Sequence, residues 1–477
     1  MTGPVNPFLP DIQKAWDVAK AFQIEDANFA VANNSVVLGH KTGLGKTFIS
    51  MLAWSMWPNA QKALITGTLA SLSVWIRLLS KWAGVVPNFV QGMSDPLWKQ
   101  ALGARTGVYM MTNQSFLYCM RQVERGKPRF DLLINDELHR VMRTRNQTWK
   151  AFKRLDFDHY LGLSATWASR GPQDCFPVLN LVNHQTFSSY WRFVNTWCHV
   201  EQTSFGTEIF GVKNAEQLRA MLFQRYYRAR TWKQVGNQFR EGPNADKDPV
   251  IRRAERVPMS KQQTKLIEDL DRHMIAELGD QRVVTPNSLA LLTRQLQMAV
   301  SPRILLPGAE PGAVVDWLVD KISDDPHTVV FCPFREGLTV VRDALIKDGY
   351  PTGKVFILKG GTQPEEINRI IEAWKKSQGV CLCTIQFAQA FELDTTETAY
   401  MLGFDWDPNN NYQAEGRLRR MDSIVQDPCL VRYIVPEGSR YNDVEHVVEG
   451  KIADVSQFLI GYGKDYETIV PKRSFEV

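Results

Sequence analysis

The sequence predicts an α/β protein that is built on two parallel β-sheets, one in each half of its 477 residues. In the first half, short apolar runs alternate with amphipathic helical patterns, and a second series of the same kind begins after about residue 310. The polar segment EGPNADKDP, which starts at Glu241, lies between the two series. Apolar strands that alternate with helices are typical of parallel sheets covered on both faces. Ligands of such sheets bind at the carboxyl ends of the strands.

Five strands are expected in the first half, because each run is short, apolar and rich in β-branched residues. These runs are SVVLG from Ser35, KALITG from Lys62, TGVYMMT from Thr106, FDLLIND from Phe130 and HYLGLSA from His159. Apolar residues recur at three- and four-residue spacing from Leu72 to Trp82, which predicts a helix there.

Five more strands are expected in the second half on the same grounds. They are HTVVFC from His327, KVFIL from Lys354, GVCLC from Gly379, TAYMLG from Thr398 and CLVRYIV from Cys429. Helical patterns lie between them at 337–347 and 364–376. Because the segment from Glu241 contains Gly and two prolines, it is expected to be an exposed loop near a domain boundary. Two domains are therefore predicted, at residues 1–245 and 246–477.

The composition excludes several classes of protein. The chain has 56 Lys and Arg against 51 Asp and Glu, and a net charge of +5 is too small to establish a nucleic-acid partner. No apolar run approaches the roughly 18 residues of a membrane span, and the first residues do not resemble a secretory signal. Seven scattered cysteines without a CxxC pair favour reduced thiols over a zinc site or a disulfide scaffold. A cytoplasmic location is expected, or a nuclear one in a eukaryote.

The first candidate site is the segment HKTGLGKTF from His40 to Phe48, between a predicted strand and an apolar helix. A glycine-rich turn at a helix N-terminus points backbone N–H groups at an anion. The residues predicted to hold the phosphates of a nucleotide are Thr42, Gly43, Leu44, Gly45, Lys46 and Thr47. Lys46 would contact the β- and γ-phosphates, and the Thr47 hydroxyl would bind Mg²⁺. A chance Gly-Lys-Thr turn is the alternative, but the strand before it and the helix after it favour a nucleotide site.

The second candidate site is an acidic pair at the end of the strand FDLLIND. Asp136 would hold Mg²⁺, and Glu137 would act as the general base that deprotonates the attacking water. His139 is predicted to link this strand end to Ser164 and Thr166 at the end of the next one. Acidic residues also cap helices in solvated turns. With a phosphate loop in the same half of the chain, the catalytic interpretation is favoured.

A third candidate lies in the segment WDPNNNYQAEGRLRRMD, which follows the predicted strand TAYMLG. On a continuous helix, Gln413, Gly416, Arg417 and Arg420 would share one face, because they recur at three- and four-residue spacing. Two guanidinium groups on such a face would stabilise the charge on a transferred γ-phosphoryl group. A solvated basic face is the alternative. Glycine inside a helix costs stability, which favours a packing or functional reason for Gly416.

Two basic segments are candidates for nucleic-acid binding. RVMRTRNQTWKAFKR, from Arg140 to Arg154, has six basic residues and no acidic one. Arg140, Arg143 and Arg145 are predicted to contact the nucleic-acid backbone, which gives sequence-independent and salt-sensitive binding. The second segment, RYYRARTWK from Arg225, interleaves basic and aromatic residues that could stack on bases. The alternatives are a solvated helix face for the first segment and an amphipathic core helix for the second.

The order of these segments resembles that of superfamily 2 helicases, and specifically of the Swi/Snf-like double-stranded DNA translocases. The KTGLGKT loop and the DELH box resemble motifs I and II, and LGLSAT resembles motif III. The other matching segments are AFQIEDANFAVANN (the Gln motif), ASLSVWIRLLSKW (motif Ia), YMMTNQSF (motif Ib), TVVFCPF (motif IV) and 380–420 (motifs V and VI). The resemblance covers nearly the whole chain. His40 departs from it, because the family has a small residue at this position.

The resemblance implies two RecA-like lobes with ATP in the cleft between them. It implies that Gln23 contacts the adenine and that Gln413 belongs to the nucleotide site. It also implies contacts to the tracking nucleic-acid strand from Ser71, Thr112 and Thr384. A compact motor of this kind, without accessory modules, is typical of a virus or a bacterium.

The expected function is therefore that of an ATP-dependent translocase on double-stranded DNA, working with other replication, recombination or repair proteins. RNA is not excluded as a partner. Two alternatives stay open. One is a strand-separating DNA or RNA helicase, because SAT in motif III is commoner in other branches of superfamily 2. The other is a module that binds ATP without hydrolysing it, against which Glu137 and the two arginines argue.

Overall fold

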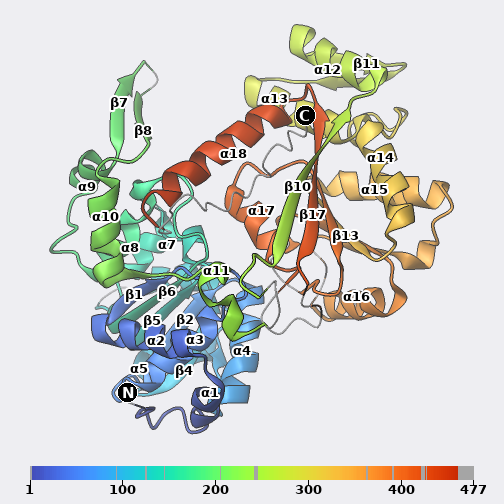
Figure 1. The fold of residues 1–477 in the computed structure, drawn as a ribbon. Coiled ribbons are helices and arrows are strands. Elements are labelled where there is room, and N and C mark those ends of the chain that lie inside the picture. Colours follow the sequence, from blue (N-terminus) through green and yellow to red (C-terminus); the bar gives the residue numbers. More distant parts are fainter. Residues whose placement is uncertain are drawn as a thin grey trace. The chain divides into compact units, whose positions relative to one another are not determined.

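The computed structural model describes residues 3–92, 94–123, 126–143, 146–204, 206–240, 245–360, 362, 364–388, 392–419, 425 and 427–459. They form two compact units (Figure 1). Unit 1 takes the chain up to Asp246 and again from Ala453, and unit 2 takes Lys247–Ile452. Among the helices of these residues, none is both long and apolar enough to cross a membrane.

Unit 1 contains a seven-stranded sheet in the order β3-β4-β2-β5-β6-β1-β9, with every neighbouring pair parallel. Its strands are β1 Ser35–Leu38, β2 Lys62–Gly67, β3 Asn88–Phe89, β4 Gly107–Thr112, β5 Arg129–Asp136, β6 Asp156–Leu163 and β9 Tyr227–Arg228. All five predicted strands are present. The two that were not predicted, β3 and β9, have only two residues each, too few to carry an apolar pattern.

The helices of unit 1 include those predicted between the strands. They are α1 Gln13–Val18, α2 Ala21–Asn33, α3 Lys46–Ser55, α4 Leu69–Ala83, α5 Pro96–Gly103, α6 Asn113–Arg121, α7 Gln147–Phe152, α8 Phe176–Val182, α9 Tyr190–Trp197, α10 Ala215–Met221 and α11 Trp232–Val235. Helix α4 begins three residues earlier than predicted, because Thr68 caps it by accepting the N–H of Ser71. It ends at Gly84, whose φ of 66° suits glycine.

Aromatic side chains dominate the core of unit 1. Tyr109, Phe116, Phe130 and Phe152 are fully buried, and the rings of Phe116 and Phe152 stack with centroids 4.2 Å apart. A separate antiparallel hairpin, β7 His199–Thr203 and β8 Gly206–Phe210, follows α9 and is largely exposed (Figure 1). The hairpin therefore adds nothing to the main sheet.

Unit 2 contains a six-stranded, fully parallel sheet in the order β10-β17-β16-β13-β15-β14. Its strands are β10 Val250–Pro258, β13 Thr328–Cys332, β14 Val355–Leu358, β15 Val380–Thr384, β16 Thr398–Leu402 and β17 Cys429–Glu437. The five predicted strands are present, which confirms the prediction of two parallel-sheet α/β lobes. The strand β10 was not predicted, because polar residues such as Arg252, Arg253 and Glu255 interrupt its apolar ones.

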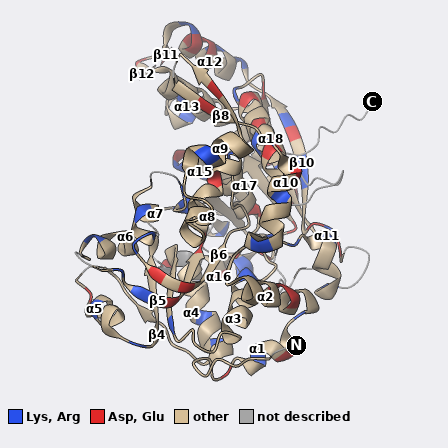
Figure 2. Ribbon diagram, turned by 90° about the vertical axis from the view of Figure 1, so that its left-hand side faces the viewer, with Lys and Arg blue, Asp and Glu red and all other residues tan. Residues whose placement is uncertain are grey.

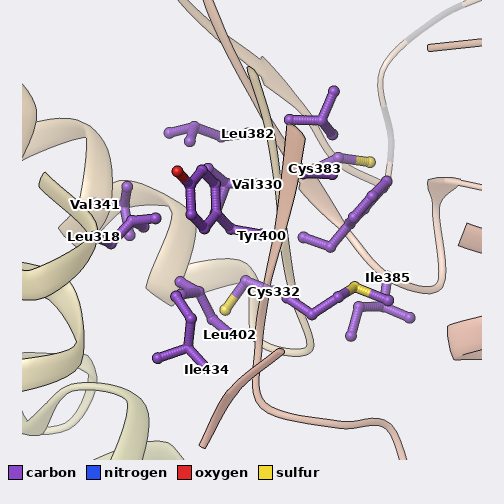
Figure 3. Close-up of a cluster of buried hydrophobic side chains, with 14 of the residues drawn as sticks. Leu318, Val330, Cys332, Val341, Leu382, Cys383, Ile385, Tyr400, Leu402 and Ile434 are labelled. Atoms are coloured by element: carbon purple, nitrogen blue, oxygen red, sulfur yellow. The ribbon is translucent and has the colours of Figure 1, made fainter. Parts of the chain in front are cut away.

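Helices and a small hairpin complete unit 2. They are α12 Lys261–His273, β11 Ile275–Leu278, β12 Gln281–Val284, α13 Ser288–Val300, α14 Ala313–Asp324, α15 Arg335–Lys347, α16 Pro364–Ser377, α17 Pro408–Glu415 and most of α18 Tyr441–Ser456, whose residues from Ala453 belong to unit 1. Figure 3 shows part of the core, where Leu318 of α14 and Val341 of α15 pack with Tyr400 of β16. The apolar runs seen in the sequence thus form the buried centre of the sheet.

The predicted helix through Gln413 and Arg417 is shorter than expected. Helix α17 ends at Glu415, and Gly416 is its C-cap residue rather than an interior one. The N–H of Arg417 then bonds to the carbonyl of Ala414 at 3.1 Å, in a tighter turn. The prediction that Gln413 and Arg417 share the face of one continuous helix is therefore wrong, because the helix has ended before Arg417.

A buried ion pair joins the end of α17 to the strand β10. Arg252 Nη2 lies 2.9 Å from Glu415 Oε2, and the Tyr433 hydroxyl donates to Glu415 Oε1 at 2.7 Å. The Glu415 side chain is only 1% exposed. Glu415 therefore holds α17 against the neighbouring strands β10 and β17, which carry Arg252 and Tyr433.

We expect Glu415→Ala to lower the free energy of unfolding of unit 2 by about 3 kcal/mol, because it removes the nearer of the two carboxylates that pair with the buried Arg252 guanidinium and leaves Asp248, at 3.4 Å. Urea denaturation measures this loss. The matched control is Glu268→Ala, which breaks the exposed Arg272–Glu268 pair and should cost less than about 1 kcal/mol. If both variants lost the same free energy of unfolding, the buried Arg252–Glu415 pair would contribute no more stability than an exposed ion pair, which would contradict the prediction.

Candidate active site

The order of the strands brings the two predicted catalytic segments to one edge of the unit 1 sheet. The phosphate loop follows β1, the acidic pair ends β5, and β6 lies between these strands. Leu38 and Asp136 both pair with Leu163, so they stand at the same level of the sheet. Because neighbouring strands are about 4.8 Å apart, the two strand ends are roughly 10 Å from each other.

The phosphate loop has the backbone that its glycines predict. Gly43 and Gly45 have φ values of 82° and 78°, in the left-handed region that glycine adopts readily. Helix α3 begins at Lys46 with Gly45 as its N-cap residue, so no cap side chain covers the N–H groups of the first turn. Thr47 is half-buried in this turn. An anion is favoured at such a helix start.

Contacts within the loop, and one from Trp232 of α11, fix its other residues. Lys46 Nζ donates to the carbonyl oxygen of His40 at 3.0 Å, so the ammonium group lies across the loop. The N–H of Leu44 bonds to the carbonyl of Lys41 at 3.2 Å, and Trp232 Nε1 donates to the carbonyl of Thr42 at 3.3 Å. The predicted phosphate-binding residues therefore form one ordered turn.

The acidic pair lies at the end of β5, where Asp136 is buried and Glu137 is half-buried. Trp75 Nε1 donates to Asp136 Oδ2 at 3.0 Å, and the N–H of Glu137 donates to Asp136 Oδ1 at 2.9 Å. Burial, together with the neighbouring charge of Glu137, raises the pKa of the Asp136 carboxyl. Glu137 has a φ of 52°, an uncommon value for a residue other than glycine and one found at functional sites.

The residues present fit a magnesium ion. A buried carboxylate beside a second acid is electrostatically costly, and a cation at this edge would relieve that cost. Carboxylate and hydroxyl oxygens, here from Asp136 and Thr47, are the ligand type that Mg²⁺ prefers. This ion takes few protein ligands and completes its shell with water and phosphate oxygens.

The predicted link between the two strand ends is present in the structure. His139 Nδ1 lies 3.0 Å from Ser164 Oγ and 3.4 Å from Glu137 Oε2. The N–H of Thr166 in turn donates to Ser164 Oγ at 3.1 Å. His139 therefore contacts both the acidic pair and the turn that follows β6.

Comparison with known proteins assigns the family. Residues 22–302 match the model of the SNF2-related domain, and residues 312–422 match that of the helicase conserved C-terminal domain. The chain belongs to the SNF2-related family. The predicted membership of the Swi/Snf-like branch is thereby confirmed.

Curated relatives match this SNF2-related chain along most of its length at low identity. A "SWI/SNF-related matrix-associated actin-dependent regulator of chromatin subfamily A-like protein 1" of Drosophila melanogaster is 20% identical over 99% of this chain and 61% of its own length. A "Chromodomain-helicase-DNA-binding protein 8" of Xenopus tropicalis is 19% identical over 84% of this chain and 20% of its own. The chain thus spans less than two thirds of the length of these relatives.

A solved structure of a "Sulfolobus solfataricus SWI2/SNF2 ATPase core in complex with dsDNA" is also similar. It is 16% identical, with 90% of each chain covered and a TM-score of 0.41. The core domain from the same organism, described without DNA, has a TM-score of 0.38 over 90% of this chain and 87% of that one.

Three of the four remaining predicted nucleotide contacts lie among the residues that the structure describes. Gln23 is buried in the first turn of α2, where its Oε1 accepts the N–H of Lys20 at 3.0 Å. In unit 2, Gln413 is buried in α17 and Arg417 is half-buried just after it. Arg420 lies outside the described residues. The roles of these residues in nucleotide binding stay predictions.

The predicted nucleic-acid contacts in unit 1 lie near the carboxyl edge of its sheet. Gly67 and Thr112 are register partners at the ends of β2 and β4, and Ser71 and Thr112 take part in capping the helices that follow. Arg140 and Arg143 are exposed after β5, and the following helix α7, labelled in Figure 2, carries one further basic residue, Lys150.

Two further predicted contacts are Thr384 and Arg145. Thr384 is the last residue of β15 in unit 2 and is half-buried. Arg145 lies outside the described residues. For both residues, contact with a nucleic acid stays a prediction.

The second basic segment is not the amphipathic core helix that one interpretation of the sequence predicted. It contains the short strand β9 rather than one amphipathic helix, and Arg228 and Arg230 bind the carboxylate of Asp26. The guanidinium groups of these two arginines are therefore engaged inside unit 1, and the stacking of this segment on bases stays a prediction.

Two groups of contacts near the site were missed by sequence reasoning. One is the bond from Trp75 to Asp136, and the other is the set of contacts that Asp26 makes beside the phosphate loop. His40 was the one visible signal of the second group, since it replaces a small residue of the family pattern.

Proposed function

We propose that this SNF2-related chain hydrolyses ATP to ADP and phosphate and uses the cycle to move along duplex DNA. The observation that carries the proposal is the shared sheet edge of the phosphate loop and the acidic pair, two strands apart. Phosphoryl transfer depends mainly on positioning and on charge stabilisation, and this edge offers both.

The loop and the first turn of α3 bind the triphosphate in this proposal. The N–H groups of the turn and the ammonium of Lys46 contact the β- and γ-phosphate oxygens. Thr47 and Asp136 hold Mg²⁺, which neutralises charge on those oxygens when bound. Gln23 contacts the adenine.

Glu137 accepts the proton of the attacking water. The water oxygen forms a bond to the γ-phosphorus while the bond from that phosphorus to the bridging oxygen breaks, and ADP leaves. His139, 3.4 Å from Glu137 Oε2, orients the carboxylate. Arg417 and Arg420 of the second half stabilise the charge on the transferred group, as arginine residues do in related chemistry. Gln413 supports the same nucleotide.

Duplex DNA is the proposed track. Relatives of this chain carry names such as "Chromodomain-helicase-DNA-binding protein 8", and Arg140 and Arg143 expose positive charge after β5. Together with Arg145, Ser71, Thr112 and Thr384 they would contact the backbone without reading sequence.

A strand-separating helicase on DNA or RNA is the second candidate. It is favoured by the Ser-Ala-Thr turn after β6, whose Ser164 contacts His139 at 3.0 Å. Such a link would connect hydrolysis to the separation of strands.

ATP turnover measured with duplex DNA, single-stranded DNA or RNA tests the proposal. We expect duplex DNA to raise turnover about tenfold or more and the others to raise it less. The stimulation should weaken steeply between 50 and 200 mM salt, because phosphate contacts release counterions. Stimulation by single strands or RNA alone would instead support the second candidate, and no turnover under any condition would refute both.

A further inference from the structure

A buried charged cluster lies beside the phosphate loop and has no role in the chemistry above. It consists of Asp26 of α2, His40 at the start of the loop, Arg228 of β9 and Arg230, and is called here the loop brace. The side chains of Asp26 and His40 are fully buried, with none of their surface exposed. Both arginine side chains are largely buried, at 23% and 19% exposure.

The carboxylate of Asp26 is the centre of the loop brace. His40 Nε2 lies 2.8 Å from Asp26 Oδ2, and Arg228 Nε donates to Oδ1 at 2.5 Å. Arg230 binds both oxygens, at 2.9 Å from Nε to Oδ2 and 2.8 Å from Nη2 to Oδ1. Burial alone would raise the pKa of Asp26, but the bonds from His40, Arg230 and Arg228 hold it well below its usual range.

The backbone carbonyl groups of Arg228 and Arg230 also form hydrogen bonds with the backbone of the loop. The N–H of Gly39 donates to the carbonyl of Arg228 at 2.8 Å, and the N–H of Lys41 donates to that of Arg230 at 3.0 Å. Gly39 allows this close approach, because a Cβ there would lie 2.1 Å from the Tyr227 hydroxyl. The peptides on both sides of His40 are therefore fixed by a segment almost 190 residues further along the chain.

The carbonyl oxygen of His40 connects the loop brace to Lys46, the lysine that is predicted to bind the phosphates. The carbonyl oxygen of His40 accepts from Lys46 Nζ at 3.0 Å, so the orientation of the His40 peptide sets where the ammonium group lies. Burying a carboxylate with two guanidinium groups costs desolvation energy that an apolar cluster would avoid. The cluster is therefore better explained by the geometry it imposes than by stability.

We propose that Asp26, His40, Arg228 and Arg230 are positioning residues that hold the phosphate loop in the shape that receives a nucleoside triphosphate. They act through the backbone of Gly39, Lys41 and the His40 carbonyl, and they do not touch the phosphates. The identity of the ligand as ATP rests on the proposed function.

The test compares His40→Ala with the wild-type full-length chain. We expect the Kd for a fluorescent ATP analogue and the KM for ATP to rise about tenfold or more, because misplacing a binding group by about 1 Å is costly. The kcat at saturating ATP should stay within about threefold. His40→Gln, which keeps an N–H donor for Asp26, should recover most of the affinity. Arg230→Lys keeps the charge but loses the two-point contact, so its Kd should lie between those of His40→Ala and His40→Gln.

His159→Ala is the matched control. His159 is a partly buried histidine of the same unit that stacks on Trp57 with ring centroids 4.2 Å apart, so its loss also destabilises the fold. We expect the melting temperature of His159→Ala to fall below that of the wild-type chain, while its KM and Kd for the nucleotide stay unchanged. The proposal is overturned if folded Arg230→Lys binds the analogue like wild type while His40→Ala is unfolded, or if His40→Ala and His159→Ala have the same Kd. A wild-type chain that binds the analogue without turnover refutes the proposed hydrolysis alone, and the Kd comparison still decides the role of the loop brace.

Discussion

Glu137→Gln is expected to bind ATP as tightly as the wild-type chain and to hydrolyse it about 10²–10⁴ times more slowly. The amide has the shape of the carboxylate but cannot accept the proton of the attacking water. Because Glu137 does not hold the phosphates in this account, the affinity for the nucleotide should not change. Measurements of phosphate release and of the Kd for a fluorescent ATP analogue separate the two effects.

The structure makes this expectation specific to one of the two adjacent acids. Glu137 is held with a φ of 52° and lies 3.4 Å from His139, whereas both oxygens of Asp136 accept bonds within the site. Glu216→Gln, at an acid in the first turn of α10, is the control and should keep full turnover. Normal hydrolysis by Glu137→Gln would remove Glu137 from the mechanism.

Lys46→Ala is expected to reduce turnover to the background rate and to weaken nucleotide binding by about 100-fold. A lysine ammonium at the start of α3 supplies the positive charge that the β- and γ-phosphates need, and alanine supplies none. The same two assays measure the loss. Lys46→Arg should also lose most activity, because the planar guanidinium does not replace a compact ammonium inside a closed loop.

The control for Lys46 is Lys99→Ala, which removes an exposed lysine of α5. It has the same change in net charge, and we expect wild-type turnover and affinity. If Lys46→Ala bound ATP as tightly as Lys99→Ala, the phosphate loop would not be the nucleotide site.

Most of the two sheets could be predicted, because their central strands are buried on both faces and read as continuous apolar runs. The edge strand β10 could not, since its Arg252, Arg253 and Glu255 are placed by pairing with β17 rather than by an apolar pattern. The end of α17 was also missed. The sequence pattern continues past Glu415, but the chain tightens at Gly416.

Some features of the candidate site could likewise be predicted from the sequence, and others could not. The phosphate loop and the acidic pair were predictable because each is a short continuous segment whose chemistry follows from its residue types. The bond from Trp75 to Asp136 and the bond from Arg228 to Asp26 were not, because they join residues 61 and 202 positions apart. Only the folded sheet brings such residues together.

Phosphate release by the purified wild-type chain, with MgATP and with or without saturating duplex DNA, tests the central claim most directly. We expect turnover of about 1 per second or faster with the duplex and at least about tenfold slower turnover without it. A chain that binds the nucleotide but releases no phosphate, with or without the duplex, would contradict the claim.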